Sequence, residues 1–270
     1  MKLCTYNIWN HDKNFDKRIE KLIEEINNED IDILAMQEVR SQNIVKRLVN
    51  ACDFSHFYWK KYHDCQEGLA ILSKYEIVDT WTNWDASTDV HNSGSMIVSI
   101  KYNDMILGVC NVHLDHKNAL NREIEIVKAV QATENFQTDY NFILGDFNCT
   151  PKASVYAYLT GQWSMLNHGT KWIDLGQSYA SLKGQPPGVT IDYYNNPRWD
   201  KKVVLDIPAR FDWIFIESPY PKPHPELKSY KVIGKQGAEN ITPSDHYGVT
   251  RVLDFEPVIS ENRSLYKGRE

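Results

Sequence analysis

The chain of 270 residues is 42% hydrophobic and 12% aromatic, far richer in apolar side chains than disordered proteins are. Length and composition predict one large folded domain over residues 1–255, and the tail 256–270 lacks periodicity and is expected to be loosely held. The formal net charge is −6 and no block of Lys or Arg stands out, which argues against tight binding of long duplex DNA.

No segment of the sequence predicts a membrane anchor or a secretory leader. No apolar run approaches the roughly 20 residues that cross a bilayer, and Met1 leads directly into an apolar segment typical of a strand. The five cysteines form an odd set without a CxxC pair, so neither a disulfide framework nor a zinc ribbon is expected. These features favour a cytoplasmic protein.

The N-terminal half alternates short apolar runs with an amphipathic segment. Residues 3–9 predict a first strand, and residues 15–28 carry apolar side chains at helical spacing, which predicts a helix. Further apolar runs bounded by polar residues predict strands over residues 31–36, 68–73, 95–101 and 105–112.

The C-terminal half continues this alternation. Helices are expected over residues 118–136 and 151–160, the second of which opens with Pro151 in its first turn. Residues 183–208 are rich in Pro, Gly, Asn and Asp and predict a long surface loop beside the site. Strands are expected over residues 140–145, 211–216 and 247–253. Strands outnumber helices and follow one another both in βαβ order and as hairpins, which predicts an α/β fold with two mixed β-sheets and helices packed outside them.

Polar side chains stand at the ends of these apolar runs, one after another along the chain. Carboxylates, amides and imidazoles that point from strand ends into one cleft are costly to bury unless they bind something. The sequence therefore predicts a functional site formed by Asn7, Glu38, His113, Asp115, Asp146, Asn148, Asp212, Asp245 and His246.

Taken singly, each of these residues has a plainer interpretation. Asn7 is as consistent with a turn cap as with a ligand, and Asp146 with Asn148 fits an ordinary turn. A lone histidine is more often structural than catalytic, and Asp212 fits an ion pair with the nearby Arg210. The functional interpretation depends on the whole set occurring together.

The set occurs in the order of a known family. The matching segments are TYNIW (5–9), QE (37–38), GLAILSK (68–74), NVHLDH (111–116), Arg122, GDFN (145–148), RFDWIF (210–215) and SDH (244–246). With these segments, residues 3 to about 254 resemble the DNase I-like endonuclease/exonuclease/phosphatase superfamily, in particular its small bacterial members. The resemblance implies a four-layer α/β sandwich, in which two mixed β-sheets pack face to face with helices outside, and a metal-dependent hydrolase of phosphate esters.

The oxygen-bearing residues of the set fit a hard divalent cation. Asn7, Glu38 and Asp245 offer amide and carboxylate oxygens and no thiolate, which favours Mg²⁺ or Mn²⁺ over structural zinc. Such an ion would neutralise a phosphoryl oxygen and the charge that develops on the leaving group.

The resemblance also implies roles for the other polar residues. Asp146 would act as the general base for the attacking water, and Asn148 would donate a hydrogen bond in the transition state. His246, held by Asp212, would contact the phosphate, and His113 would bind a non-bridging oxygen. The implied reaction is in-line attack of water on phosphorus without a covalent intermediate.

Two positions depart from the family pattern and bear on substrate choice. Trp9 stands where many members carry an acidic residue, which leaves the number of metal ions open, and His91–Ser95 stands where many carry a phosphate-binding arginine. Trp9 and Arg122 are expected to bind substrate. The aromatic side chains expected near the site either stack on bases or sugars or pack as core or lid, and they are Trp9, Trp59, Tyr62, Trp172, Tyr193 and Trp199.

Several functions remain open at this point. The leading hypothesis is a phosphodiesterase or nuclease-like enzyme, and the alternative is a phosphatase or sphingomyelinase-like enzyme acting on a small or lipid head-group phosphate. A non-catalytic binding scaffold is a different class, and a serine hydrolase is disfavoured because neither Ser73 nor Ser244 lies in a GxSxG motif. The acidic balance favours a short phosphate ester as partner, such as a nucleotide, a short nucleic acid or a phosphorylated head group. No protein partner is predicted.

Overall fold

Twelve strands form two sheets of six strands each in the computed structural model, which describes residues 1–63, 65–85, 93–199, 205–235 and 241–255. The first sheet contains β1 (Lys2–Asn7), β2 (Ile33–Val39), β3 (His56–Lys61), β4 (Gly68–Ser73), β11 (Glu226–Ile233) and β12 (Gly248–Asp254). The second sheet contains β5 (Ile77–Thr82), β6 (Gly94–Tyr102), β7 (Met105–His113), β8 (Tyr140–Asp146), β9 (Trp172–Asp174) and β10 (Asp212–Glu217). Their orders are β11-β12-β1-β2-β4-β3 and β5-β6-β7-β8-β10-β9.

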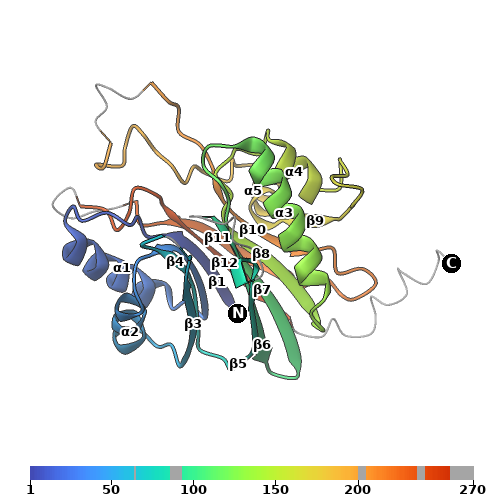
Figure 1. The fold of residues 1–270 in the computed structure, drawn as a ribbon, viewed down its shortest axis with the longest axis horizontal. Helices are drawn as coiled ribbons and strands as arrows, with labels where there is room; N and C mark the ends of the chain where they lie inside the picture. The colour runs from blue at the N-terminus through green and yellow to red at the C-terminus, as the bar shows by residue number, and fades with distance from the viewer. Residues whose placement is uncertain (64, 86–92, 200–204, 236–240, 256–270) are drawn as a thin grey trace.

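Helices cover the outer faces of both sheets (Figure 1). α1 (Phe15–Glu29) and α2 (Gln42–Ala51) lie on the first sheet, and α3 (Ala119–Glu134) and α4 (Ser154–Leu159) lie on the second. α5 (Leu175–Lys183) contacts β10 and β11, one strand of each sheet, and the short 3-10 helix η1 (Asn83–Asp85) precedes β6. The four layers confirm the predicted α/β sandwich.

The alternation of side chains along each strand separates an inner core from two outer ones. In β1, Leu3 packs between the sheets, whereas Cys4 and Tyr6 pack in the outer core with residues of α1 and α2. In β8, Leu144 faces the inner core and Ile143 packs in the outer core with residues of α3 and α4. Each fully buried aliphatic side chain contributes about 1.5–3 kcal/mol to folding.

The strand directions bring the ends of several strands to one edge. Among the described strands, β1–β2 and β7–β8 pair in parallel, and the other neighbours pair antiparallel. α1 connects the first parallel pair and α3 connects the second, as βαβ units require. The polar residues at the carboxyl ends of these four strands therefore lie at the ends of the two sheets.

Several predicted elements have different bounds in the structure, and two of them bear on the site. The strand expected over residues 31–36 runs from Ile33 to Val39, so that Gln37 and Glu38 lie within it rather than after it. The helix expected over residues 151–160 is shorter, because a turn in which the Ala153 N–H donates to the Thr150 carbonyl at 2.9 Å precedes it.

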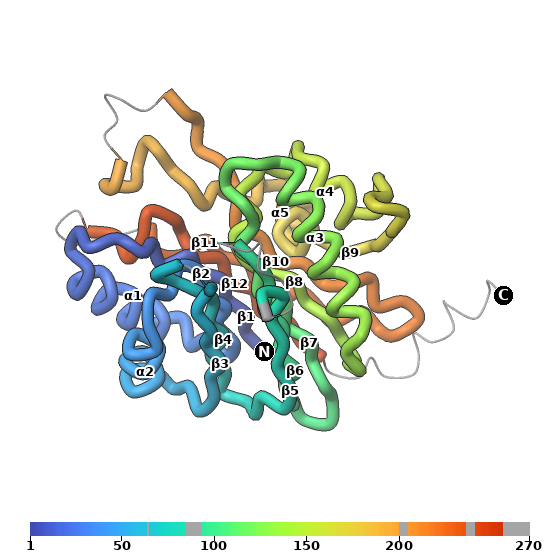
Figure 2. Tube along the Cα trace, viewed as in Figure 1, coloured from blue at the N-terminus to red at the C-terminus, as the bar shows by residue number. Residues whose placement is uncertain are grey.

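The predicted surface loop over residues 183–208 is partly interior. α5 extends to Lys183, and in the connection that follows Thr190 and Ile191 are buried; Ile191 pairs with both Ala209 and His246. In Figures 1 and 2 this connection stands at the end of the sandwich where β1 ends. The remaining predictions for 200–204, for His91–Asn92 and for the tail 256–270 lie outside the described residues.

No helix in the described ranges is long and apolar enough to cross a membrane. All five cysteines are free thiols.

Candidate active site

Three of the predicted site residues stand in one row across the second sheet. β7, β8 and β10 are neighbours, and their register places Asp146 opposite both His113 and Asp212. Each of these residues is separated by two or four positions from an inward-facing core residue on its strand, such as Leu144 on β8 and Ile214 on β10, and therefore points to the same face of the sheet. All three side chains therefore point into the space between the sheets, where they are buried.

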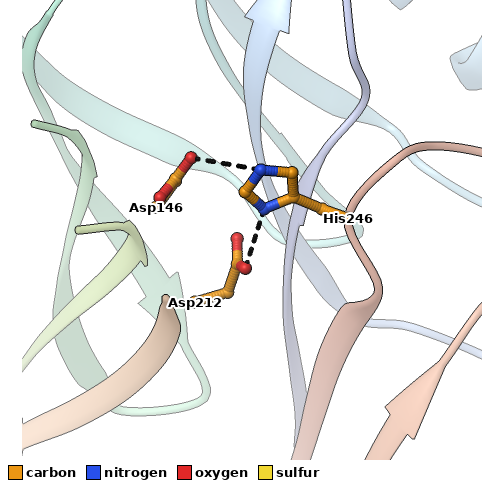
Figure 3. A group of neighbouring side chains, drawn as sticks. All are labelled: Asp146, Asp212 and His246. Atoms are coloured by element: carbon orange, nitrogen blue, oxygen red, sulfur yellow. Dashed lines mark hydrogen bonds and ion pairs between the residues drawn. The ribbon is translucent and has the colours of Figure 1, made fainter. Parts of the chain in front are cut away.

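His246 faces this row from the segment that precedes β12 (Figure 3). Its Nδ1 lies 2.9 Å from Asp212 Oδ2, and its Nε2 lies 3.7 Å from Asp146 Oδ2. Burial opposes a positive charge on the ring, but the carboxylates of Asp212 and Asp146 outweigh it and raise the pKa of His246 well above its ordinary value. This shift favours the imidazolium form of the ring, although burial also raises the pKa of its partner Asp212. Arg210, the other partner considered for Asp212, pairs with Asp174 at 2.6 Å.

Asp146 is the centre of the polar cluster. Its Oδ2 accepts a hydrogen bond from Asn7 Nδ2 at 3.0 Å and lies 3.8 Å from His113 Nε2. Its Oδ1 accepts from the Asn148 N–H at 2.8 Å. One carboxylate is thus surrounded by an amide, a main-chain donor and two imidazoles.

The end of β8 and the turn that follows it contain two unusual backbone conformations. Gly145 has a φ of 147°, and a Cβ added there would lie 1.9 Å from the Val112 carbonyl oxygen. Asn148 adopts a left-handed φ of 48°, and its Nδ2 donates to the Leu114 carbonyl at 2.8 Å. An amide nitrogen has two N–H groups, so one of them stays free for a ligand.

Glu38 reaches the site through a bulge in β2. Strict alternation would place Gln37 on the inner face and Glu38 on the outer face with Met36. A register shift between Met36 and Val39 and a φ of 59° at Glu38 turn the side chain back, and Asn7 Nδ2 donates to Glu38 Oε1 at 2.9 Å. A left-handed backbone conformation at a non-glycine residue destabilises the folded state by about 1–3 kcal/mol, and such conformations cluster at functional sites.

Glu38 belongs to a group of carboxylates that repel one another. Burial and the charge of Glu38 raise the pKa of Glu67, whose Oε2 accepts from Asn10 Nδ2 at 2.8 Å. Burial also raises the pKa of Asp245 to about 6, with His246 opposing the rise and Glu38 adding to it. A cation among these oxygens would relieve the repulsion, so the residues fit a divalent metal ion.

A second group of possible ligands lies beside the first. Asp146, Asp212 and His246 are buried and offer ligand atoms within 4.8 Å of one another. Because His246 Nδ1 is already engaged by Asp212, this group forms a hydrogen-bonded chain, and the oxygen group around Glu38 fits a hard cation better. Asn7 turns its Nδ2 toward the carboxylates and its Oδ1 toward the Trp9 N–H at 3.0 Å, so binding a metal through Oδ1 requires rotation of the amide.

The two predicted substrate-binding residues border the cluster. Arg122 donates from Nη1 to the Asp115 carbonyl at 2.8 Å. The ring of Trp9 stacks on His11 with centroids 4.7 Å apart, and the guanidinium groups of Arg18 and Arg198 lie 4.5 and 4.4 Å from the Trp9 ring. Their contacts with a substrate stay a prediction.

The other aromatic side chains expected near the site divide between core and rim. Tyr62 and Trp172 are buried in the hydrophobic core, as the packing interpretation predicted. Trp59 donates from Nε1 to the Val39 carbonyl at 3.2 Å. Tyr193 and Trp199 contact each other with centroids 4.8 Å apart in the connection that follows α5.

Sequence reasoning missed several polar residues that support the site. Glu67 immediately precedes an apolar strand, a position that could have drawn attention to it. Thr190 accepts at Oγ1 from the N–H groups of Phe211 and Asp212 at 2.9 and 3.1 Å. Asn196 donates from Nδ2 to the Ser244 carbonyl at 2.9 Å. Both come from a segment without periodicity, and only the structure shows their partners.

Known proteins share this fold and its motifs. The family model described as Endonuclease/Exonuclease/phosphatase family matches residues 4–246. The uncharacterized protein F14F9.5 of Caenorhabditis elegans is 22% identical over 300 aligned residues, which cover 92% of this chain and 90% of that protein. The structure is similar to D. rerio TDP2 complexed with single strand DNA product, with a TM-score of 0.77, 16% identity and coverage of 94% and 98%. It is also similar to an endonuclease/exonuclease/phosphatase from Bacteroides vulgatus, with a TM-score of 0.72, 16% identity and coverage of 94% and 98%.

Proposed function

The chain belongs to the Endonuclease/Exonuclease/phosphatase family, and from this membership we propose that it is a phosphodiesterase of the nuclease type. The observation that carries the proposal is the position of Asp146, a buried carboxylate with the Nε2 atoms of His113 and His246 at 3.8 and 3.7 Å. In-line displacement at phosphorus needs a base for the water and donors for the phosphoryl oxygens, and this cluster contains both.

The proposed reaction is a single displacement. A water molecule attacks phosphorus, its proton passes to the Asp146 carboxylate, and the bond between phosphorus and the leaving oxygen breaks. The His246 imidazolium, kept charged by Asp212, offsets the negative charge that grows on the phosphoryl oxygens. His113 and Asn148 offer further N–H donors to the non-bridging oxygens, so four neighbouring side chains share the work of positioning and charge stabilisation.

The carboxylates outside this row are proposed to bind Mg²⁺ or Mn²⁺. Glu38, Asp245 and the Asn7 amide would hold the ion, and Glu67 lies close enough for the charge of Glu38 to raise its pKa. The ion, when bound, supplies Lewis-acid stabilisation of the phosphoryl and leaving oxygens.

The substrate proposed is a nucleotide ester or a short single strand of nucleic acid. Support comes from the D. rerio TDP2 structure, which is complexed with single strand DNA product, and from the net charge of −6 without a basic block, which disfavours long duplexes. The free cysteines fit a reducing compartment, so the activity is proposed to be cytoplasmic.

The test is a comparison of phosphate esters. Purified protein is incubated with thymidine 5′-(p-nitrophenyl phosphate), a short single-stranded oligonucleotide, p-nitrophenyl phosphate and sphingomyelin vesicles, each with Mg²⁺, with Mn²⁺ and with EDTA. Turnover of the two nucleotide diesters with either cation, and none in EDTA, is expected. Preferred turnover of the monoester or of sphingomyelin would replace the proposal with a phosphatase or a sphingomyelinase-like enzyme, and binding of all substrates without hydrolysis would indicate a scaffold.

A further inference from the structure

One arginine beside the active site lies against two aromatic rings and has an Nε atom without a hydrogen-bond partner among the described residues. The guanidinium of Arg198 lies 4.4 Å from the Trp9 ring centroid and 4.8 Å from the Trp199 ring centroid. Guanidinium groups that stack on aromatic rings keep their N–H edge exposed for a ligand. The Trp9 N–H donates to Asn7 Oδ1 at 3.0 Å, so the stack adjoins one of the proposed metal ligands.

The main chain around Arg198 is tied to the catalytic segment. The Arg198 N–H donates to Asn196 Oδ1 at 3.0 Å, and Asn196 Nδ2 donates to the carbonyls of Ser244 and Asp245 at 2.9 and 3.2 Å. Thr242 Oγ1 completes this arrangement by donating to Asn196 Oδ1 at 3.0 Å. The main chain at Arg198 is therefore held against the segment that carries Asp245 and His246, and the charge of Arg198 opposes the rise in the pKa of Asp245.

Arg198 differs from its neighbour Arg18, although both lie against Trp9 and line the same pocket. Arg18 is buried and all three of its nitrogens donate to main-chain carbonyls, including those of Ile8 at 3.0 Å and Pro243 at 3.2 Å. The Nε of Arg198 is buried and has no hydrogen-bond partner among the described residues. Arg18 holds the chain together, whereas Arg198 is available to a ligand.

The surroundings of Arg198 fit an anion. The pocket that it lines also contains Lys13 and Arg18, and none of the residues that line it is acidic. This local positive charge stands beside an acidic site in a chain of net charge −6. An arginine edge binds phosphate oxygens through two parallel hydrogen bonds, which a single lysine cannot do.

We propose that Arg198, stacked between Trp9 and Trp199, binds a second phosphate group of the substrate, next to the one that is hydrolysed. The proposal rests on the proposed phosphodiesterase function and narrows its substrate class to nucleotides and strands with neighbouring phosphates. A lipid head group with one phosphate offers this arginine no ligand.

The test uses two substrates that differ by one phosphate. They are thymidine 5′-(p-nitrophenyl phosphate) and its 3′-phosphorylated derivative. Wild-type protein should have a lower KM for the phosphorylated compound. Arg198→Ala should raise that KM by about 10-fold or more, the value of a charge-assisted pair of hydrogen bonds, and change the KM of the other compound by less than about twofold. Arg198→Lys should restore only part of the difference.

A matched control removes the same charge elsewhere. Arg47 on α2 is partly exposed and pairs with Asp16 and Glu20 on α1, so Arg47→Ala should leave both KM values unchanged. Equal losses on both substrates in Arg198→Ala, or no loss on either, would overturn the proposal.

Binding separates this proposal from the proposed function. One possible outcome is that the wild-type protein binds both compounds and hydrolyses neither. In that case the affinities for thymidine 3′,5′-bisphosphate and thymidine 5′-monophosphate, measured by calorimetry in Mg²⁺, still give the contribution of the second phosphate to binding. Tighter binding of the bisphosphate, lost in Arg198→Ala, would support the role of Arg198 while the phosphodiesterase assignment fails. Equal affinities in the wild type and the variant would overturn it.

Discussion

Replacing Asp146 with Asn removes the proposed base while keeping the shape of the side chain. General-base catalysis contributes about 10²–10⁴ to an enzymatic rate, so kcat for a nucleotide diester should fall by that factor. His246 and Asp212 remain in place, and the site should still bind phosphate.

The same change has a stability effect that the hydrogen bonds define. The Asp146 carboxylate accepts from Asn7 Nδ2 at 3.0 Å and from the Asn148 N–H at 2.8 Å. The new amide has only one acceptor oxygen, so one of these bonds is lost. A hydrogen bond to a charged group contributes about 1.5–3 kcal/mol, and removing a buried anion offsets part of that loss. A fall in Tm of a few degrees is expected, at roughly 2–4 °C per kcal/mol.

The assay measures kcat with thymidine 5′-(p-nitrophenyl phosphate) in Mg²⁺ and Tm by thermal unfolding. Asp104→Asn is the matched control, because Asp104 is an exposed residue in the turn between β6 and β7. It should leave both quantities unchanged. A kcat within about threefold of wild type in Asp146→Asn would refute the assignment of Asp146 as the base.

Four further changes test other parts of the site and fold. EDTA should abolish hydrolysis and Mg²⁺ or Mn²⁺ should restore it; full activity in excess EDTA would exclude the proposed metal. Asp212→Asn removes a carboxylate that raises the pKa of His246. The stabilisation that this carboxylate gives to the protonated ring is present at low pH and is lost as the pH rises through the folded-state pKa of His246. The alkaline limb of the kcat profile should therefore move to lower pH by about one to two units, and an unmoved limb would make Asp212 purely structural. Gly145→Ala would place a Cβ 1.9 Å from the Val112 carbonyl oxygen, so the free energy of unfolding measured with denaturant should fall by about 3 kcal/mol or more; a fall below about 1 kcal/mol would contradict the close approach of β7 and β8 at this position. Nicking of plasmid DNA should stay slower than cleavage of a short oligonucleotide across a salt series. Faster nicking, with a slope of log affinity against log salt concentration that corresponds to about five phosphate contacts, would indicate a duplex substrate instead.

The sequence predicted the interior of both sheets and missed their edges. Four strands escaped prediction, and they are the outermost strands of the two sheets, β3, β11, β5 and β9. An edge strand pairs on one side only, and β3, β5 and β11 are largely half-buried or exposed. Their residues therefore lack the continuous apolar run by which an interior strand such as β4 can be recognised.

The row of catalytic candidates could be predicted because it depends on a local rule. His113, Asp146 and Asp212 each lie an even number of residues away from apolar side chains that point inward on the same strand, so they point inward as well. Glu38 breaks that rule, because a bulge reverses its direction. Its placement needs the register of the neighbouring strand, which no local pattern contains.

The contacts of the residues that complete the rim could not be predicted for a different reason. Asn196 and Arg198 lie in a segment rich in Pro and Asn that has no period, and their partners are far away in the sequence. Contacts such as Arg198 with Trp9 form only when the connection after α5 folds over the end of β1. They depend on tertiary packing rather than on local preference.

The stereochemical outcome at phosphorus tests the proposed mechanism most directly. A nucleotide phosphorothioate diester of known configuration is hydrolysed in ¹⁸O-labelled water with Mg²⁺, and the configuration of the product is determined. Attack by water activated at Asp146 predicts inversion, because a single in-line displacement inverts the phosphorus centre. Retention would reveal a covalent intermediate and contradict the mechanism, and a complete lack of hydrolysis would contradict the proposed function itself.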